Sequence, residues 1–132
     1  MTMSKAAWRF RSVDVGAALL RREAFVRALR RRAGASSDLF GAELIYGELL
    51  TNALRHGRGP VDVRLQYDGG RALLTVIDMS TERLTFSEPH GDPLSENGRG
   101  LFLARVLSRG FEVDYGNLGK RIQVVLPVEL RS

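Results

Sequence analysis

The sequence contains no cysteine and only two histidines among its 132 residues. The absence of cysteine excludes disulfide bonds, thiolate zinc sites and cysteine nucleophiles. Two histidines, His56 and His90, argue against a metal site built from several imidazoles. No apolar run approaches the roughly 18 residues that cross a bilayer, and no signal-peptide hydrophobic region opens the chain. We therefore expect a cytoplasmic protein without a membrane partner, with residues 1–132 forming one domain.

Positive charge is abundant only in the N-terminal part of the chain. The net charge is +5 at pH 7, and residues 1–34 hold nine basic side chains against Asp14 and Glu23. Residues 35–132 hold eleven basic and thirteen acidic side chains. A basic segment can bind nucleic acid, but aromatic residues do not alternate with arginines in LLRREAFVRALRRR. We interpret this segment as the solvated face of an amphipathic helix, and nucleic acid is not an expected partner.

Hydrophobic periodicity divides the chain into strands and helices. Alternation predicts strands at 7–13, 61–67, 72–79, 111–116 and 120–128. Helical spacing predicts helices at 16–33, 36–56 and 98–110. This order predicts an α+β fold, a two-layer sandwich in which a mixed, mostly antiparallel sheet carries three helices on one face, with an ordered core over about 8–127. Residues 80–97 show no period and contain two prolines, so we expect a functional or mobile loop.

A polar stripe follows the second predicted helix. At about 100° per residue, Glu48, Asn52 and Arg55 lie close together, beside the apolar face. An ordinary solvated helix face explains this pattern as well as a functional site does. In a functional site the amide oxygen of Asn52 would ligate a hard cation such as Mg²⁺, and Glu48 would orient or deprotonate a hydroxyl.

Two further features are candidates for the same site. Asp78 ends the apolar strand LLTVID, where a buried carboxylate needs a partner. That partner is either the exocyclic amine of a purine or a local bond involving Ser80 and the turn. The segment GRGL, Gly98 to Leu101, opens the third helix, and its free N–H groups would suit a phosphate. A plain glycine-rich helix start is the alternative.

The segments ELLTNALRHG, VID and GRGL, in this order, resemble the three motifs of the GHKL ATPase superfamily, which has the Bergerat fold. The superfamily includes gyrase, heat-shock chaperones, histidine kinases and MutL. The short chain and its N-terminal strand and helix resemble most closely the anti-sigma-factor serine kinases of the RsbW/SpoIIAB type. The resemblance implies a histidine kinase-like ATPase domain that uses ATP and Mg²⁺, with residues 80–97 as the ATP lid.

The resemblance also implies roles for individual residues. Glu48 matches the catalytic carboxylate, Asn52 the Mg²⁺ ligand and Asp78 the aspartate that recognises the adenine amino group. Ala53 would lie near the adenine pocket, and His56 would cap its helix. The backbone of the GRGL motif would contact phosphates, and Arg99 would face either a phosphate or solvent; the motif comprises Gly98, Arg99, Gly100 and Leu101. Many relatives carry glycine two residues after the aspartate, where this chain has Ser80.

The resemblance finally implies partners and leaves two functions open. In the first, the protein is a serine/threonine kinase that phosphorylates a STAS-domain antagonist and sequesters a sigma factor, and it pairs as a homodimer. In the second, the protein is a non-catalytic module that senses nucleotide, binding ATP and a protein partner without phosphotransfer. Transfer of the γ-phosphate of ATP to a STAS-domain protein distinguishes the two.

Overall fold

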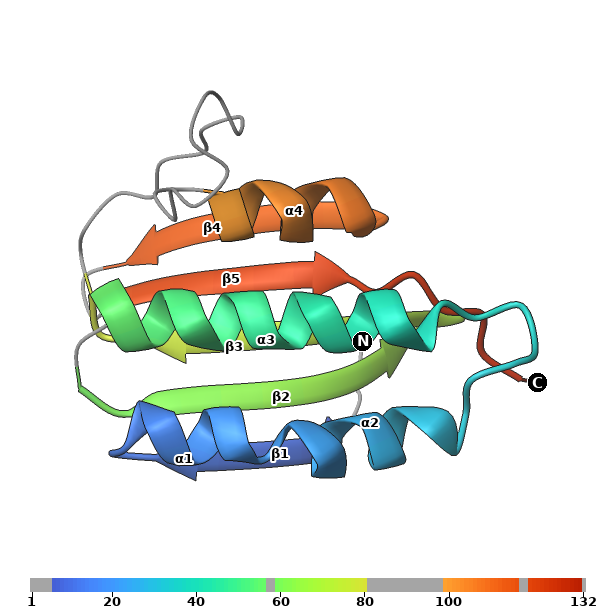
Figure 1. The fold of residues 1–132 in the computed structure, drawn as a ribbon, viewed down its shortest axis with the longest axis horizontal. Helices are drawn as coiled ribbons and strands as arrows, with labels where there is room; N and C mark the ends of the chain where they lie inside the picture. The colour runs from blue at the N-terminus through green and yellow to red at the C-terminus, as the bar shows by residue number, and fades with distance from the viewer. Residues whose placement is uncertain (1–5, 57–58, 81–98, 117–118, 132) are drawn as a thin grey trace.

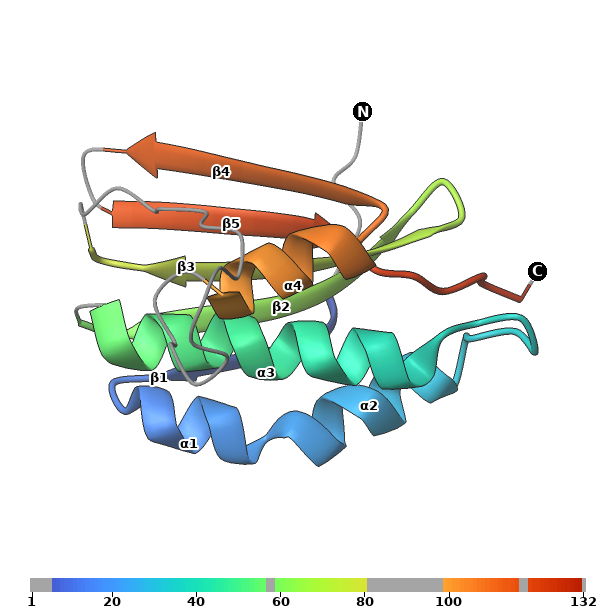
Figure 2. The same cartoon turned by 45° about the horizontal axis from the view of Figure 1, so that its top comes forward.

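The computed structural model describes residues 6–56, 59–80, 99–116 and 119–131. Within these ranges a five-stranded sheet forms one layer and the helices form the other, as Figures 1 and 2 show. This arrangement confirms the predicted α+β fold class. In chain order the elements are β1 (Ala6–Ser12), α1 (Val15–Leu20), α2 (Arg22–Arg30), α3 (Leu39–His56), β2 (Val61–Asp68), β3 (Arg71–Asp78), α4 (Arg99–Leu107), β4 (Gly110–Gly116) and β5 (Gly119–Val125).

The strands lie in the order β1-β2-β3-β5-β4. Every ladder between the described strands is antiparallel, so the sheet is not mixed. The hairpin between β2 and β3 turns at Gly69 and Gly70, whose φ angles of 57° and 85° are readily adopted by glycine. Strand β5 lies between β3 and β4, which brings the end of β3 against the start of β5.

Helix α3 lies along the middle of the helical layer (Figure 1). Asp38 caps its N-terminal end, because the side chain of Asp38 accepts a hydrogen bond of 2.8 Å from the backbone N–H of Gly41. No helix within the described ranges is long and apolar enough to cross a membrane. The largest fully buried apolar side chains of the core are Phe25, Leu29, Ile45, Tyr46, Leu49, Leu50, Leu65, Leu74, Ile122 and Leu126.

The prediction of one helix over residues 16–33 was wrong, because the chain forms α1 and α2 with a break at Arg21. In a continuous helix the carbonyl of Ala18 would accept from the backbone N–H four residues later. Here it accepts instead from the N–H of Arg21 at 3.1 Å and from the hydroxyl of Tyr46 at 2.6 Å. Since Tyr46 lies on α3, the break depends on a tertiary contact that no local pattern reveals.

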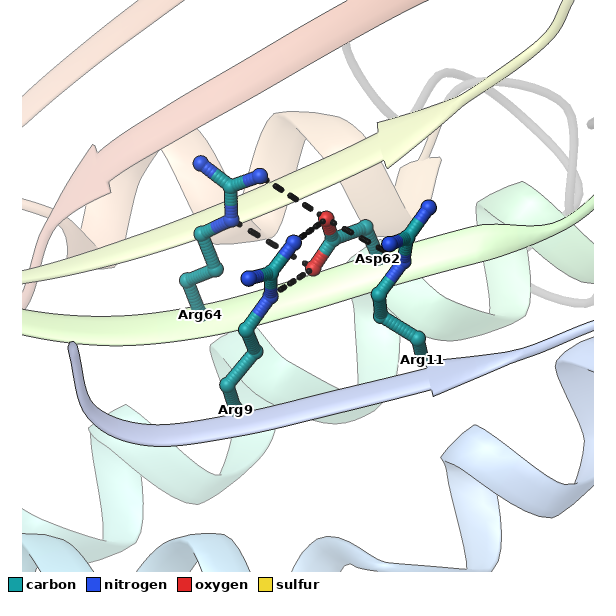
Figure 3. A network of polar contacts seen from close by, with 4 residues as sticks. All are labelled: Arg9, Arg11, Asp62 and Arg64. Carbon is teal, nitrogen blue, oxygen red and sulfur yellow. Dashed lines mark hydrogen bonds and ion pairs between the residues drawn. The ribbon is translucent and has the colours of Figure 1, made fainter.

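The face of the sheet away from the helices carries charged side chains. Asp62 on β2 lies there among Arg9, Arg11 and Arg64 (Figure 3). Arg9 donates to both carboxylate oxygens at 3.1 and 2.8 Å, and Arg64 donates to them at 3.4 and 2.9 Å. Burial raises the pKa of Asp62, but the hydrogen bonds and positive charges of Arg9 and Arg64 outweigh burial, so the net pKa is lowered.

This lowered pKa predicts an acid-sensitive contribution to stability. A carboxyl whose pKa is lower in the folded state stabilises the fold above its unfolded pKa, and that stabilisation is lost as the pH falls through the folded value. We expect Asp62→Asn to destabilise the protein at pH 7, and the difference from wild type to shrink below about pH 4. Urea unfolding at both pH values measures this. Asp68→Asn, on the exposed hairpin, is the control, and a difference that does not depend on pH would contradict the prediction.

Candidate functional site

Four chain segments, three of which carry predicted site residues, meet at one end of the molecule, the left in Figure 1. They are the C-terminal ends of α3 and β3 and the N-terminal ends of α4 and β5. Antiparallel pairing brings the ends of β3 and β5 together, with Asp78 opposite Lys120. Contacts between α3 and α4 bring their facing surfaces together above the sheet. Residues far apart in sequence therefore share one end of the fold.

Asn52, on the last part of α3, is half-buried, and its side-chain oxygen Oδ1 is fully buried without a hydrogen-bond partner among the described residues. A buried acceptor without a donor costs free energy, so such an atom calls for an explanation. A carboxamide oxygen is a suitable ligand for a hard cation such as Mg²⁺. The unpaired oxygen of Asn52 therefore fits the predicted cation site.

Glu48 lies one turn before Asn52 on α3 and is half-buried. Among the described residues its carboxylate forms no hydrogen bond and no ion pair. It lines a groove of about 720 Å³ between α3 and the first two helices. The groove is lined by Leu19, Leu20, Arg22, Glu23, Phe40, Glu43, Leu44, Gly47, Glu48 and Thr51.

Asp78 ends β3 with its side chain only 2% exposed. Its Oδ1 accepts a hydrogen bond of 2.7 Å from the backbone N–H of Ser80, so the local turn bond considered from the sequence is present. Its Oδ2 lies 3.7 Å from Nζ of Lys120. The turn bond occupies only Oδ1 of Asp78, and Oδ2 faces Lys120. The two partners considered from the sequence, a local turn bond and a purine amine, are therefore compatible, because each would use a different oxygen.

Lys120 is the residue that sequence reasoning missed. Its side chain is 0% exposed, and Nζ has no hydrogen-bond partner within the described part of the chain. Along β5 it alternates in phase with Ile122 and Val124, both in the core. A lysine on the apolar face of a strand was the available signal, because lysine is almost never fully buried unless it is paired.

Gly119 explains how Lys120 reaches Asp78. Its φ is 145°, a conformation that other residues rarely adopt, and an added Cβ would lie 2.0 Å from the carbonyl oxygen of Asp78. Only glycine allows the two backbones to approach this closely. The start of β5 is thereby held against the end of β3, with the lysine facing the carboxylate.

The remaining predicted residues divide into three groups. Leu101 and Ala53 are buried in the core. Helix α4 begins at Arg99 and includes Gly100, as the glycine-rich start predicted. Gly98 and the lid, apart from Ser80, lie outside the described residues. The structure thus joins Asp78 to Lys120, and it spaces Glu48 and Asn52 one helical turn apart.

Comparisons with known proteins agree with this fold. The family model of the histidine kinase-like ATPase domain matches residues 14–126. No curated protein matches the sequence. The Acinetobacter baumannii histidine kinase AdeS is similar in structure, with 13% identity, a TM-score of 0.55, and coverage of 93% of this chain and 68% of that one. The histidine kinase domain of the E. coli osmosensor EnvZ gives 14% identity, a TM-score of 0.50, and coverage of 100% and 95%.

The histidine kinase domain of the Erythrobacter litoralis EL346 blue-light activated histidine kinase gives 24% identity and a TM-score of 0.49 over 86% of this chain. This chain spans 61% of that domain's length. At 13% and 14% identity, the similarities to AdeS and EnvZ show the fold alone. The family model, in contrast, covers most of the sequence. The chain therefore belongs to the family of histidine kinase-like ATPase domains.

Proposed function

We propose that this chain is an ATP-binding protein serine/threonine kinase of the anti-sigma-factor type, which phosphorylates a STAS-domain antagonist and sequesters a sigma factor. The observation that carries ATP binding is a pair of buried polar atoms at one end of the fold, Oδ1 of Asn52 and Nζ of Lys120, which have no hydrogen-bond partner in the described part of the chain. Family membership supports the same ligand. The resemblance to the RsbW/SpoIIAB type supports the choice of partners and a homodimer.

In this mechanism each residue has a limited task. Asn52 would hold Mg²⁺, which supplies positive charge to the phosphate oxygens. The backbone N–H groups at the start of α4 would face phosphate, because a helix N-terminus favours an anion. Asp78 would accept a hydrogen bond from the adenine amino group. Positioning and electrostatic stabilisation account for most of the catalysis of phosphoryl transfer.

Glu48 would act on the acceptor hydroxyl of the partner. The hydroxyl oxygen forms a bond to the γ-phosphorus, the bond from that phosphorus to the β–γ bridging oxygen breaks, and the hydroxyl proton passes to Glu48. The groove beside Glu48 supports a protein as the acceptor, because exposed apolar side chains of Leu20 and Phe40 line it. Such a surface suits a protein segment more than water alone.

Glu48→Ala tests this assignment. We expect the variant to bind Mg·ATP like wild type and to transfer phosphate about 10²- to 10⁴-fold more slowly, the usual contribution of a general base. Transfer is measured with ATP labelled in its γ-phosphate and candidate STAS-domain proteins as acceptors. Glu112→Ala, on the sheet face away from the helices, is the matched control and should retain full transfer.

Two outcomes would contradict the proposal in different ways. Unchanged transfer in Glu48→Ala would remove the catalytic role of this residue. ATP binding by the wild type without transfer to any STAS-domain acceptor would favour the non-catalytic module that senses nucleotide.

A further inference from the structure

Lys120 presents a buried ammonium group for which the described residues supply no hydrogen-bond acceptor. Its side chain is 0% exposed, and Oδ2 of Asp78 lies 3.7 Å from Nζ, beyond hydrogen-bond distance. An ammonium group carries three donors, and burying them unpaired costs free energy. The arrangement is therefore suited to a ligand that brings an acceptor to Nζ.

The side chains of Asp78 and Lys120 point into the same layer. Asp78 alternates in phase with Leu74 and Val76, and Lys120 with Ile122, and these three apolar side chains lie in the core beneath the helices. Cross-strand pairing sets Asp78 directly opposite Lys120. A ligand entering between the sheet and the helices at this end would meet both side chains side by side.

Together the two side chains form one acceptor and one donor, 3.7 Å apart. Oδ1 of Asp78 is already engaged by the N–H of Ser80, which leaves Oδ2 as the acceptor for a ligand. The complementary ligand edge has a donor next to an acceptor. Adenine has such an edge, with its exocyclic amine beside the ring nitrogen N1.

We propose that Lys120 is a base-recognition residue, which donates a hydrogen bond directly to N1 of adenine while Asp78 accepts one from the exocyclic amine. The inference rests on the proposed binding of ATP. Under this proposal the adenine base is recognised by a charged hydrogen-bond donor, Lys120, in addition to the acceptor Asp78. Because the donor is charged and buried, its bond to N1 makes a large contribution to nucleotide affinity.

The test compares Mg·ATP with Mg·1-deaza-ATP, in which a C–H replaces N1, by calorimetric titration into the full chain. We expect wild type to bind 1-deaza-ATP about 10- to 100-fold more weakly, as for the loss of a hydrogen bond to a charged group. In Lys120→Met the two nucleotides should bind within about twofold of each other, because the donor to N1 is gone. Discrimination that persists in Lys120→Met would overturn the proposal.

A second comparison needs no variant, in case Lys120→Met does not fold. Mg·7-deaza-ATP carries the same replacement on the opposite edge of the base and should bind wild type about as tightly as ATP. Equal affinities for all three nucleotides, or equal losses for both analogues, would overturn the role of Lys120 and leave ATP binding intact. Failure of wild type to bind ATP at all would instead overturn the proposed function, and this inference with it.

Discussion

We expect Asn52→Ala to lose Mg²⁺-dependent ATP binding while keeping its fold. The buried Oδ1 of Asn52 has no hydrogen-bond partner among the described residues, so its removal breaks no hydrogen bond to that atom there. An interaction with a charged group is worth about 1.5–3 kcal/mol, so affinity should fall about 10- to 100-fold. Calorimetric titration of Mg·ATP, and of ATP with a metal chelator, measures the loss.

The stability of Asn52→Ala, unlike its affinity for ATP, should not fall. Alanine has a higher helix propensity than asparagine, and the substitution removes an unsatisfied buried acceptor, so the free energy of unfolding should equal or exceed that of wild type. Leu54→Ala, at an exposed position on the same helix, is the control and should leave ATP binding unchanged. Wild-type affinity in Asn52→Ala would show that the cation is held elsewhere.

The second large effect is expected for Asp78→Asn, on folding as well as on binding. The variant removes the negative charge beside Lys120, whose ammonium then remains buried without an opposite charge. Breaking a buried ion pair in this way costs about 3–5 kcal/mol. ATP binding should also weaken severely, because an amide cannot replace the carboxylate as acceptor for the adenine amine while facing the same ammonium. Urea unfolding and calorimetry measure the two losses.

The double variant Asp78→Asn/Lys120→Met separates the two losses. Removing the ammonium as well abolishes the uncompensated charge, so the double variant should be more stable than Asp78→Asn alone. ATP binding should remain lost, because neither group of the pair is restored. If the free energy of unfolding of Asp78→Asn lies within about 1 kcal/mol of the wild-type value, the ion pair of Asp78 and Lys120 does not stabilise the folded state.

The sequence was sufficient to predict those elements whose structure is determined by local periodicity. The alternation at residues 61–67 and 72–79 predicted strands β2 and β3, and helical spacing over 36–56 predicted α3. The break at Arg21 was missed because it depends on the hydroxyl of Tyr46, a residue far along the chain. Local patterns do not contain that information.

The candidate site was predictable in part for the same reason. The position of Asp78 at the end of an apolar strand predicted a buried carboxylate in need of a partner, and the structure places Asp78 in that environment. The contact of Asp78 with Lys120 could not be predicted, because the pairing of β3 with β5 follows from the strand order of the whole sheet. The functional roles of Glu48 and Asn52 rest on the resemblance and stay predictions.

The alternation of side chains across the sheet also limits the ways in which this chain can misfold. A slip of one residue in the pairing of a strand turns all its side chains to the opposite face. For β2 such a slip would bury Asp62 and Arg64 beneath the helices and expose the valines now in the core. A slip of β5 would likewise set Arg121 instead of Lys120 opposite Asp78. Strand pairings that bury further charge are therefore disfavoured, and the native register sets the buried charges of Asp78 and Lys120 opposite each other.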